Sequence, residues 1–337
     1  MKLFTSLINT IKEHFRLKLI ICFILCAILP LLILGTISYK ISYNIAKDKI
    51  LKETAISCEK NQHLLENRMT QIENLEDSIH FNLCMLCTTA EQPMSNYLDK
   101  LSAVRNNIAS IADSFNIYHV NIFLPDDSFA SKEGLTFCSL SDLKKYKVQL
   151  SDFSKQGLTP NWIFRKDINF PYMVSKGEEP SGVLSCYRYA KINSQKTCLA
   201  VHITSEELSN YLNTFSESNP SLSYIINSEG VVLSSTDKKQ IGGSLSNEKL
   251  HAITQNLRLS HFSYDKCEII STPVHNQLFL VTETPDYYIR QSSSFLVKMI
   301  FICFMIIVPL TMLSIIWVAD QMTNKINHLS HSMSEIK

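Results

Sequence analysis

Glycine is scarce in this sequence, with 8 in 337 residues. Loops that cradle phosphate groups depend on glycine, and none of the patterns GxxxxGK[ST], GxGxxG, HExxH or GxSxG occurs. Excess charge of one sign is also lacking, because 32 basic residues face 31 acidic ones and the net charge is +1. We therefore expect no nucleic-acid partner, no cofactor, no metal and no catalytic centre in this chain.

Two long apolar runs, 19–37 and 299–318, contain no charged residue. At a rise of ~1.5 Å per residue, a helix over either run would cover most of a ~30 Å hydrocarbon core. Each run carries one proline, Pro30 or Pro309, a residue that is rare inside soluble helices but tolerated in membrane helices. Both runs are therefore predicted to be transmembrane helices.

The basic residues before the first run indicate its orientation. The tail 1–18 carries four lysine or arginine residues, which favour the cytoplasmic side. The run exceeds the hydrophobic part of a signal peptide, and no A-x-A-like cleavage site follows it. We predict a multi-pass protein of the cell membrane in which 38–298 is extracytoplasmic and 319–337 is cytoplasmic.

Ten cysteines raise the question of disulfides or a metal site. The pair Cys84-x-x-Cys87 lies among apolar residues and lacks a second pair with zinc-like spacing, which favours buried positions on a helix face over a metal or redox site. Cys186 and Cys198 fall on two neighbouring predicted strands and are the better candidates for a disulfide.

Segment 41–115 is predicted to form long helices. It contains no glycine, and its single proline, Pro93, separates a first helix from a second one over 94–115. The first helix carries an apolar stripe made of Leu65, Met69, Ile72, Leu75, Ile79, Leu83 and Leu86. Such a stripe is typical of a helix that dimerises or braces a domain, and equally of an ordinary helix that faces a core.

The sequence period changes to that of strands after this segment. A distal unit over 116–217 and a proximal unit over 220–284 show the same order of strand, turn, variable middle and hairpin. Thr204-Ser-Glu-Glu207 has the pattern of a helix capping box, and Pro285 is suited to the first position of a helix. The predicted strands are 119–124, 184–190, 198–203, 222–227, 231–235, 267–272 and 278–283.

This order of elements resembles the double Cache sensors. The similarity is carried by Tyr224-Ile-Ile-Asn-Ser-Glu-Gly-Val-Val-Leu-Ser-Ser235, by Ile241-Gly-Gly-Ser244 and by Asn121-Ile-Phe-Leu-Pro-Asp126. Among proteins of this layout the chain most resembles the amino-terminal part of YesM-like sensor histidine kinases of Gram-positive bacteria. The resemblance implies an α+β membrane protein: two transmembrane helices flank a long helix and two PAS-like units, and a partial HAMP helix follows.

The HAMP assignment applies to 319–337, where Met322, Ile326, Leu329, Met333 and Ile336 follow the spacing of a parallel dimeric helix. The resemblance implies a homodimer that passes an extracytoplasmic signal to a histidine kinase region absent from this sequence, and through it to a response regulator. A chemotaxis or cyclase output and a stand-alone, membrane-anchored interaction protein are the alternatives.

A PAS-like sheet offers a face for a ligand, and polar or aromatic residues of the distal unit are candidates to line it. These candidates are Trp162, Arg165, Tyr172, Tyr187 and Tyr189. Because neighbours on a strand alternate between faces, Tyr187 and Tyr189 are predicted to share one face and Arg188 to take the other. The expected partner is a small molecule or a solute-binding protein, and the pattern around Trp162 does not match the amino-acid-binding version of the fold.

Overall fold

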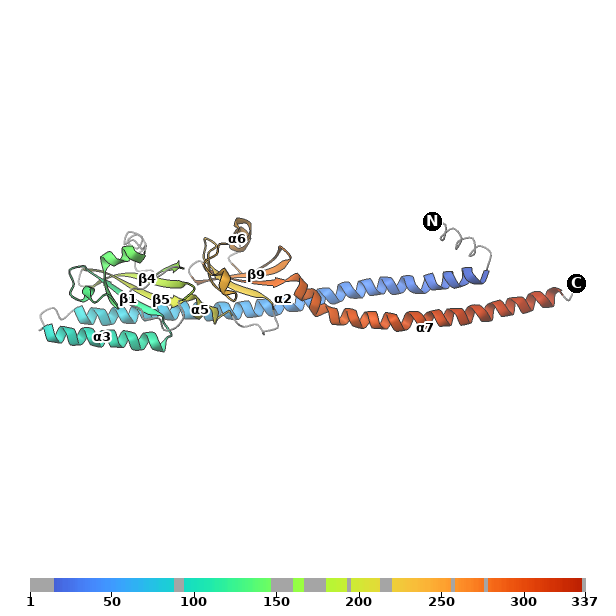
Figure 1. Cartoon of the computed structure of the whole chain (residues 1–337), viewed down its shortest axis with the longest axis horizontal. Coiled ribbons are helices and arrows are strands. Elements are labelled where there is room, and N and C mark those ends of the chain that lie inside the picture. Colours follow the sequence, from blue (N-terminus) through green and yellow to red (C-terminus); the bar gives the residue numbers. More distant parts are fainter. Residues whose placement is uncertain are drawn as a thin grey trace. The chain divides into compact units, whose positions relative to one another are not determined.

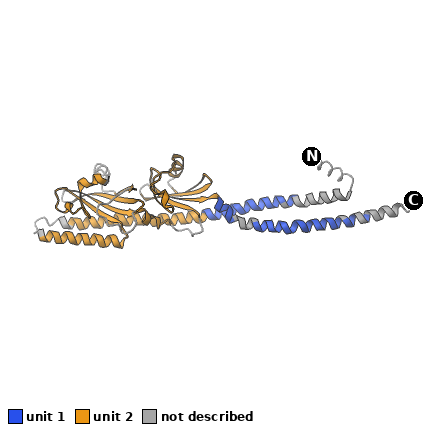
Figure 2. Cartoon of the chain, viewed as in Figure 1, with its two compact units in different colours: residues 1–51, 287–337 blue, residues 52–286 orange. Residues whose placement is uncertain are grey.

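The computed structural model describes residues 15–87, 94–146, 160–166, 180–192, 195–212, 220–255, 258–275 and 278–334. The chain divides into two compact units (Figure 2). Unit 1 combines residues 1–51 and 287–337, and unit 2 consists of residues 52–286. Unit 2 contains both sheets, so its interior holds most of the core.

Helix α2 (Phe15–Cys87) is followed by helix α3 (Met94–Ser114), as predicted. The apolar stripe of α2 is buried within this single chain, since Leu65, Ile72 and Ile79 are each at most 1% exposed. The structure thus shows the stripe facing a core. In unit 2, α2 runs along one side of both sheets (Figure 1), and its Gln62 accepts a 2.7 Å hydrogen bond from Thr272 of the second sheet.

The first sheet has five strands in the order β2-β1-β5-β4-β3. Its strands are β1 (His119–Leu124), β2 (Phe137–Ser139), β3 (Asn161–Arg165), β4 (Val183–Ile192) and β5 (Gln195–Thr204). β1 pairs with β2 in parallel, and the other pairs are antiparallel. The predicted strand 119–124 and the predicted hairpin are confirmed. Two short 3-10 helices, η1 (Ala130–Lys132) and η2 (Leu140–Tyr146), flank β2.

The second sheet has the order β7-β6-β10-β9-β8. Its strands are β6 (Leu222–Ile226), β7 (Val232–Ser235), β8 (Ser260–Tyr264), β9 (Cys267–Val274) and β10 (Leu278–Pro285), with helix α6 (Asn247–Thr254) and the 3-10 turn η3 (Lys238–Gln240) between them. Pro285 ends β10, opposite Cys267, and does not open a helix as predicted. Proline lacks an N–H group, and the end of a strand tolerates that loss.

Helix α5 (Ser205–Ser209) joins the two sheets. Thr204 Oγ1 accepts a 3.1 Å bond from Glu207 N, which is the first half of the predicted capping box. The Ser205 hydroxyl donates to the carbonyl of Leu233 at 2.6 Å, and the Ser234 hydroxyl donates to the carbonyl of Ser205 at 2.6 Å. These bonds tie the end of the first sheet to strand β7 of the second.

Unit 1 contains the beginning of α2 and most of helix α7 (Asp286–Ser334). Within the described residues, Lys298–Met322 is long and apolar enough to cross a membrane, with a mean hydropathy of 2.8. The run 19–37 is helical, and its membrane crossing stays a prediction. The two helices meet at Gly35, where an added Cβ would lie 3.0 Å from Phe304 Cε2.

Candidate functional site

The two faces of the first sheet have different chemistry. On β4, Cys186 and Arg188 point toward α2, whereas Tyr187 and Tyr189 point to the opposite face, which we call the outer face. The predicted separation of Arg188 from the two tyrosines is thus confirmed. Each face has to be considered as a separate candidate site.

The outer face contains a buried chain of hydrogen bonds. Asn121 donates through Nδ2 to the carbonyl of Leu135 at 2.7 Å, and its Oδ1 lies 3.0 Å from His202 Nε2. Nε2 therefore carries the proton, and Nδ1 accepts the 2.7 Å bond from the hydroxyl of Ser185. Burial, followed by the nearby charge of His119, holds the pKa of His202 well below its usual value, so His202 is neutral.

Ser185, His202 and Asn121 have the residue types of a nucleophilic triad, but their burial argues against that chemistry. Ser185 and His202 are 0% exposed, and Asn121 is 2% exposed. A nucleophile must reach its substrate, and the Ser185 hydroxyl instead satisfies an internal acceptor. This network is structural: it pairs polar groups that would otherwise be costly to bury.

Aromatic residues on the outer face differ in accessibility. Tyr187 is 1% exposed and belongs to a core cluster with Phe123 and Leu143. Tyr189 packs on the same cluster but is only partly buried, as are Tyr118, Leu140 and Ile163. Tyr189 is therefore available to a ligand, whereas Tyr187, on the same face of β4, is a core residue.

The structure does not bring the predicted site residues together. Arg165 pairs with Val183, six residues from Tyr189 along β4, which corresponds to ~20 Å on a strand. Trp162 points to the opposite face, toward α2, where its indole bonds Glu73. Tyr172 lies outside the described residues. Of the predicted set, Tyr189 remains the best candidate for ligand contact on the outer face.

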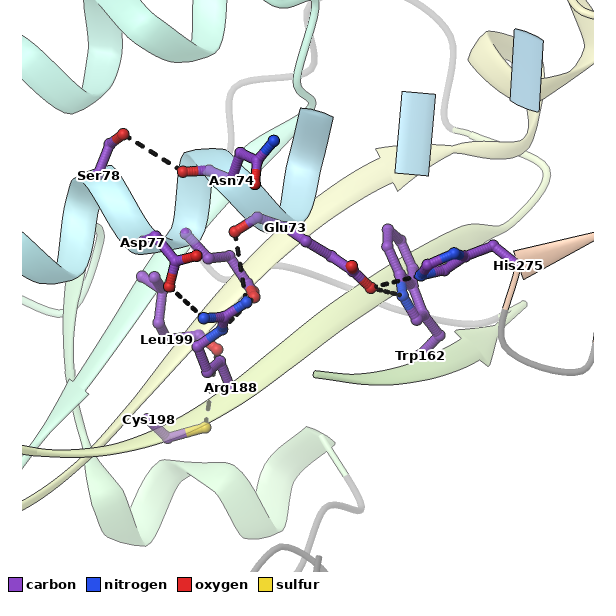
Figure 3. Close-up of polar contacts among 10 residues, drawn as sticks. Glu73, Asn74, Asp77, Ser78, Trp162, Arg188, Cys198, Leu199 and His275 are labelled. Carbon is purple, nitrogen blue, oxygen red and sulfur yellow. Dashed lines mark hydrogen bonds and ion pairs between the residues drawn. The ribbon is translucent and has the colours of Figure 1, made fainter. Parts of the chain in front are cut away.

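The face toward α2 carries a cluster of charged and polar side chains, shown in Figure 3. Glu73 Oε1 accepts a 3.1 Å bond from the indole N–H of Trp162 on β3, and it lies 2.8 Å from Nε2 of His275 at the end of the second sheet. One carboxylate of α2 thus contacts both sheets. Sequence reasoning missed this role, since Trp162 and His275 are over a hundred residues apart.

Glu76 lies one helical turn from Glu73 and is 0% exposed. Its Oε2 accepts a 3.2 Å bond from Arg188 Nε, and the same guanidinium bonds Asp77 and the carbonyl of Glu73. Burial raises the pKa of Glu76 to about 8, although the positive charge of Arg188 acts in the opposite direction. A carboxyl with such a shifted pKa between packed elements is a candidate functional group.

The predicted disulfide between Cys186 and Cys198 is wrong. Cys186 is paired with Val201 and Cys198 with Tyr189, so the two cysteines lie on opposite faces of the sheet. Both are free thiols. Cys84 Sγ lies 3.7 Å from His80 Nε2, and the described part of the chain holds no group of three or more metal-binding side chains. The side chain of Cys87 lies outside the described residues.

We expect both thiols to be reactive after unfolding without reductant. Alkylation in denaturant followed by mass spectrometry of the peptides should show Cys186 and Cys198 fully modified. Exposing the folded protein to mild oxidant before unfolding should leave this result unchanged, because the sheet separates the two sulfur atoms. A peptide pair linked through these two cysteines would contradict the register of β4 and β5.

No protein-family model and no curated protein sequence matches the chain. Solved structures, in contrast, match it. The periplasmic sensory domain of the Campylobacter jejuni chemoreceptor Tlp1 is similar with a TM-score of 0.54 and 14% identity, over 71% of this chain and 98% of that one. The chain has a sensory-domain fold.

Two further structures with this fold are extracellular domains of proteins assigned as histidine kinases. For vpHK1S-Z8 the TM-score is 0.54 at 13% identity, over 73% of this chain and 98% of that one. For rpHK1S-Z16 the TM-score is 0.51 at 15% identity, over 72% and 96%. The sensory-domain fold thus occurs both in a chemoreceptor and in proteins assigned as histidine kinases.

Proposed function

We propose that this chain is the input part of a membrane receptor that detects an extracytoplasmic small molecule or solute-binding protein. The observation that carries the proposal is the fold: two sheets along one long helix, as in sensory domains that are matched over nearly their whole length. The segment Lys298–Met322, which is apolar enough to cross a membrane, lies on the helix that starts directly after the second sheet.

In finer detail, we propose a double Cache receptor with a second membrane helix over 19–37, a homodimeric state and a HAMP helix that begins near residue 319. The output would be a histidine kinase of the YesM-like type that acts on a response regulator. A chemoreceptor output is the second candidate, because Tlp1 is as similar to the chain as vpHK1S-Z8. Reading the gene in frame beyond codon 337 distinguishes the two.

In the proposed mechanism, contacts from both sheets shift the packing equilibrium of helix α2. A ligand bound beside Tyr189 changes the packing of the first sheet, and Trp162 and Arg188 transmit the change to Glu73 and Glu76 of α2. His275 connects the second sheet to the carboxylate of Glu73. A ligand shifts such an equilibrium only if it binds one packing better than the other.

We expect Tyr189→Ala to abolish the response to the ligand while the fold remains intact, because Tyr189 is partly exposed on the outer face. Tyr187→Ala should instead destabilise the protein by about 3–5 kcal/mol, since it removes a buried aromatic ring. Output of a chimera with the cytoplasmic half of a known receptor, together with circular dichroism, separates the two effects. An unaltered response in Tyr189→Ala would move the ligand site elsewhere.

The sidedness of the proposal is tested with a membrane-impermeant lysine reagent on spheroplasts. Lys191 and Lys196 on the β4–β5 hairpin are exposed, and so is Lys325 on α7 beyond the apolar segment. The hairpin lysines should be modified in intact spheroplasts, and Lys325 only after lysis. Modification of the hairpin only after lysis would exclude an extracytoplasmic sensor, and modification of Lys325 from outside would exclude a membrane crossing between the hairpin and Lys325.

A further inference from the structure

Glu76 is a carboxyl group in the middle of the apolar stripe of α2. Leu65, Ile72 and Ile79 recur every seven residues, and the positions four residues after each are Met69, Glu76 and Leu83. All of these side chains are at most 2% exposed. A carboxylate at such a position is costly unless its partners compensate for the lost hydration.

The partners of Glu76 do not fully compensate for an ionised carboxylate. Oε2 is bonded to Arg188, but Oε1 makes no hydrogen bond of ordinary geometry, and its neighbouring donor is the weak S–H group of Cys186. The guanidinium of Arg188 is also shared with Asp77. A proton on Glu76 removes the buried negative charge.

Titratable and charged groups face Glu76 from every element packed around it. From α2 these are Glu73 and Asp77, from β4 Cys186 and Arg188, and from the end of β9 His275, which acts through Glu73. The carboxyl groups of Glu76 and Asp77 and the main-chain carbonyl of Glu73 thus all accept hydrogen bonds from one guanidinium (Figure 3). Protonation of Glu76 brings the cluster closer to neutrality while the hydrogen bonds from Arg188 to Asp77 and to the Glu73 carbonyl remain available.

We propose that Glu76 is a proton-binding site, through which the pH outside the membrane sets how firmly helix α2 is held on the first sheet. The protonated state favours the packed arrangement, and ionisation loosens it. This second input goes beyond the proposed solute sensor. It rests on the proposed topology only for the side of the membrane on which the proton is sensed, and its test requires no solute.

Trp162 provides an optical probe of the site. It is one of two tryptophans, it pairs across the strands with Cys186, and its indole bonds Glu73. In the full chain carrying Trp317→Phe, reconstituted in lipid nanodiscs, all tryptophan emission comes from Trp162. A titration from pH 5 to pH 9 should shift this emission with a midpoint near the pKa of Glu76, about 8.

The variants assign the titration to one group. Glu76→Gln, which keeps the size of the side chain and cannot ionise, should abolish the shift with its midpoint near 8. The shift should persist in Glu59→Gln, which alters an exposed carboxylate of the same helix, and in His275→Asn. A shift that survives Glu76→Gln, or that His275→Asn removes, would overturn the proposal.

Infrared difference spectra between pH 6 and pH 9 supply a readout that does not depend on a substitution at the site. The unaltered protein should lose the carbonyl stretch of a buried protonated carboxyl group as the pH rises. Absence of that band would overturn the proposal even if Glu76→Gln failed to fold. Failure of the lysine-labelling test, in contrast, would leave the proton site intact and change only the side from which it is reached.

Discussion

As the pH rises from 5 to 8, the unaltered protein is expected to lose about 4 kcal/mol of unfolding free energy that Glu76→Gln keeps. Burial raises the pKa of Glu76 from 4.5 to about 8, so between these values the folded chain keeps a proton that the unfolded chain has released. The stability that this proton contributes is fully present below pH 4.5 and is lost as the pH rises through 8. Each pH unit in this window changes the difference by about 1.4 kcal/mol.

Urea unfolding of the full chain in detergent, followed by circular dichroism, measures this difference at each pH. Glutamine cannot ionise, and subtraction of the two curves removes the contribution of all other titrating groups. Glu59→Gln changes an exposed carboxylate on the same helix and should give a difference that is flat with pH. Parallel curves for Glu76→Gln and the unaltered protein would mean that Glu76 is ionised in the fold at pH 5.

His202→Phe is expected to cost about 2–4 kcal/mol at pH 7, because it leaves the Ser185 hydroxyl and the Asn121 amide without their buried partner. The cost should shrink in acid. The pKa of His202 in the fold lies well below 6.5, so the stability that the neutral ring contributes is present above pH 6.5 and is lost as the pH falls. At pH 5 the unaltered protein has lost part of that stability, whereas phenylalanine has none to lose.

The same unfolding experiment at pH 7 and pH 5 tests this expectation. His251→Phe is the matched control, since His251 is exposed on α6 and should give a small, pH-independent change. Combining His202→Phe with Ser185→Ala should recover part of the loss by removing one of the two unpaired groups. An equal cost at both pH values would indicate that His202 is not held neutral by its surroundings.

The helices and most strands follow from the sequence because their periods are strong. The stripe from Leu65 to Leu83 and the predicted strand 119–124 are both present in the structure. The stripe also contained the signal for Glu76, which occupies an apolar position of the repeat. Because the predicted stripe was defined by its apolar residues alone, Glu76 was not part of it.

The distribution of side chains between the two faces of the first sheet was less predictable because it depends on strand register. Cys186 pairs with Val201, and this register of β4 and β5 places Cys186 and Cys198 on opposite faces. The sequences of the two strands do not specify that register by themselves. Strand β3 was not expected at all, so Trp162 was assigned to the ligand rather than to α2. The contact of His275 with Glu73 requires the tertiary fold.

The two hydrogen bonds that Ser205 and Ser234 exchange across the sheets bear on the construction of hybrid receptors. The buried Ser205 hydroxyl, at the end of the first sheet, donates to a main-chain carbonyl of β7, and the buried Ser234 hydroxyl of β7 donates to the main-chain carbonyl of Ser205. The two sheets are therefore joined by these side chains as well as by the peptide chain. A hybrid that takes its first sheet from one receptor and its second from another should therefore carry both serines across the cut. Recombination between related genes would face the same restriction, and the two sheets would be inherited together.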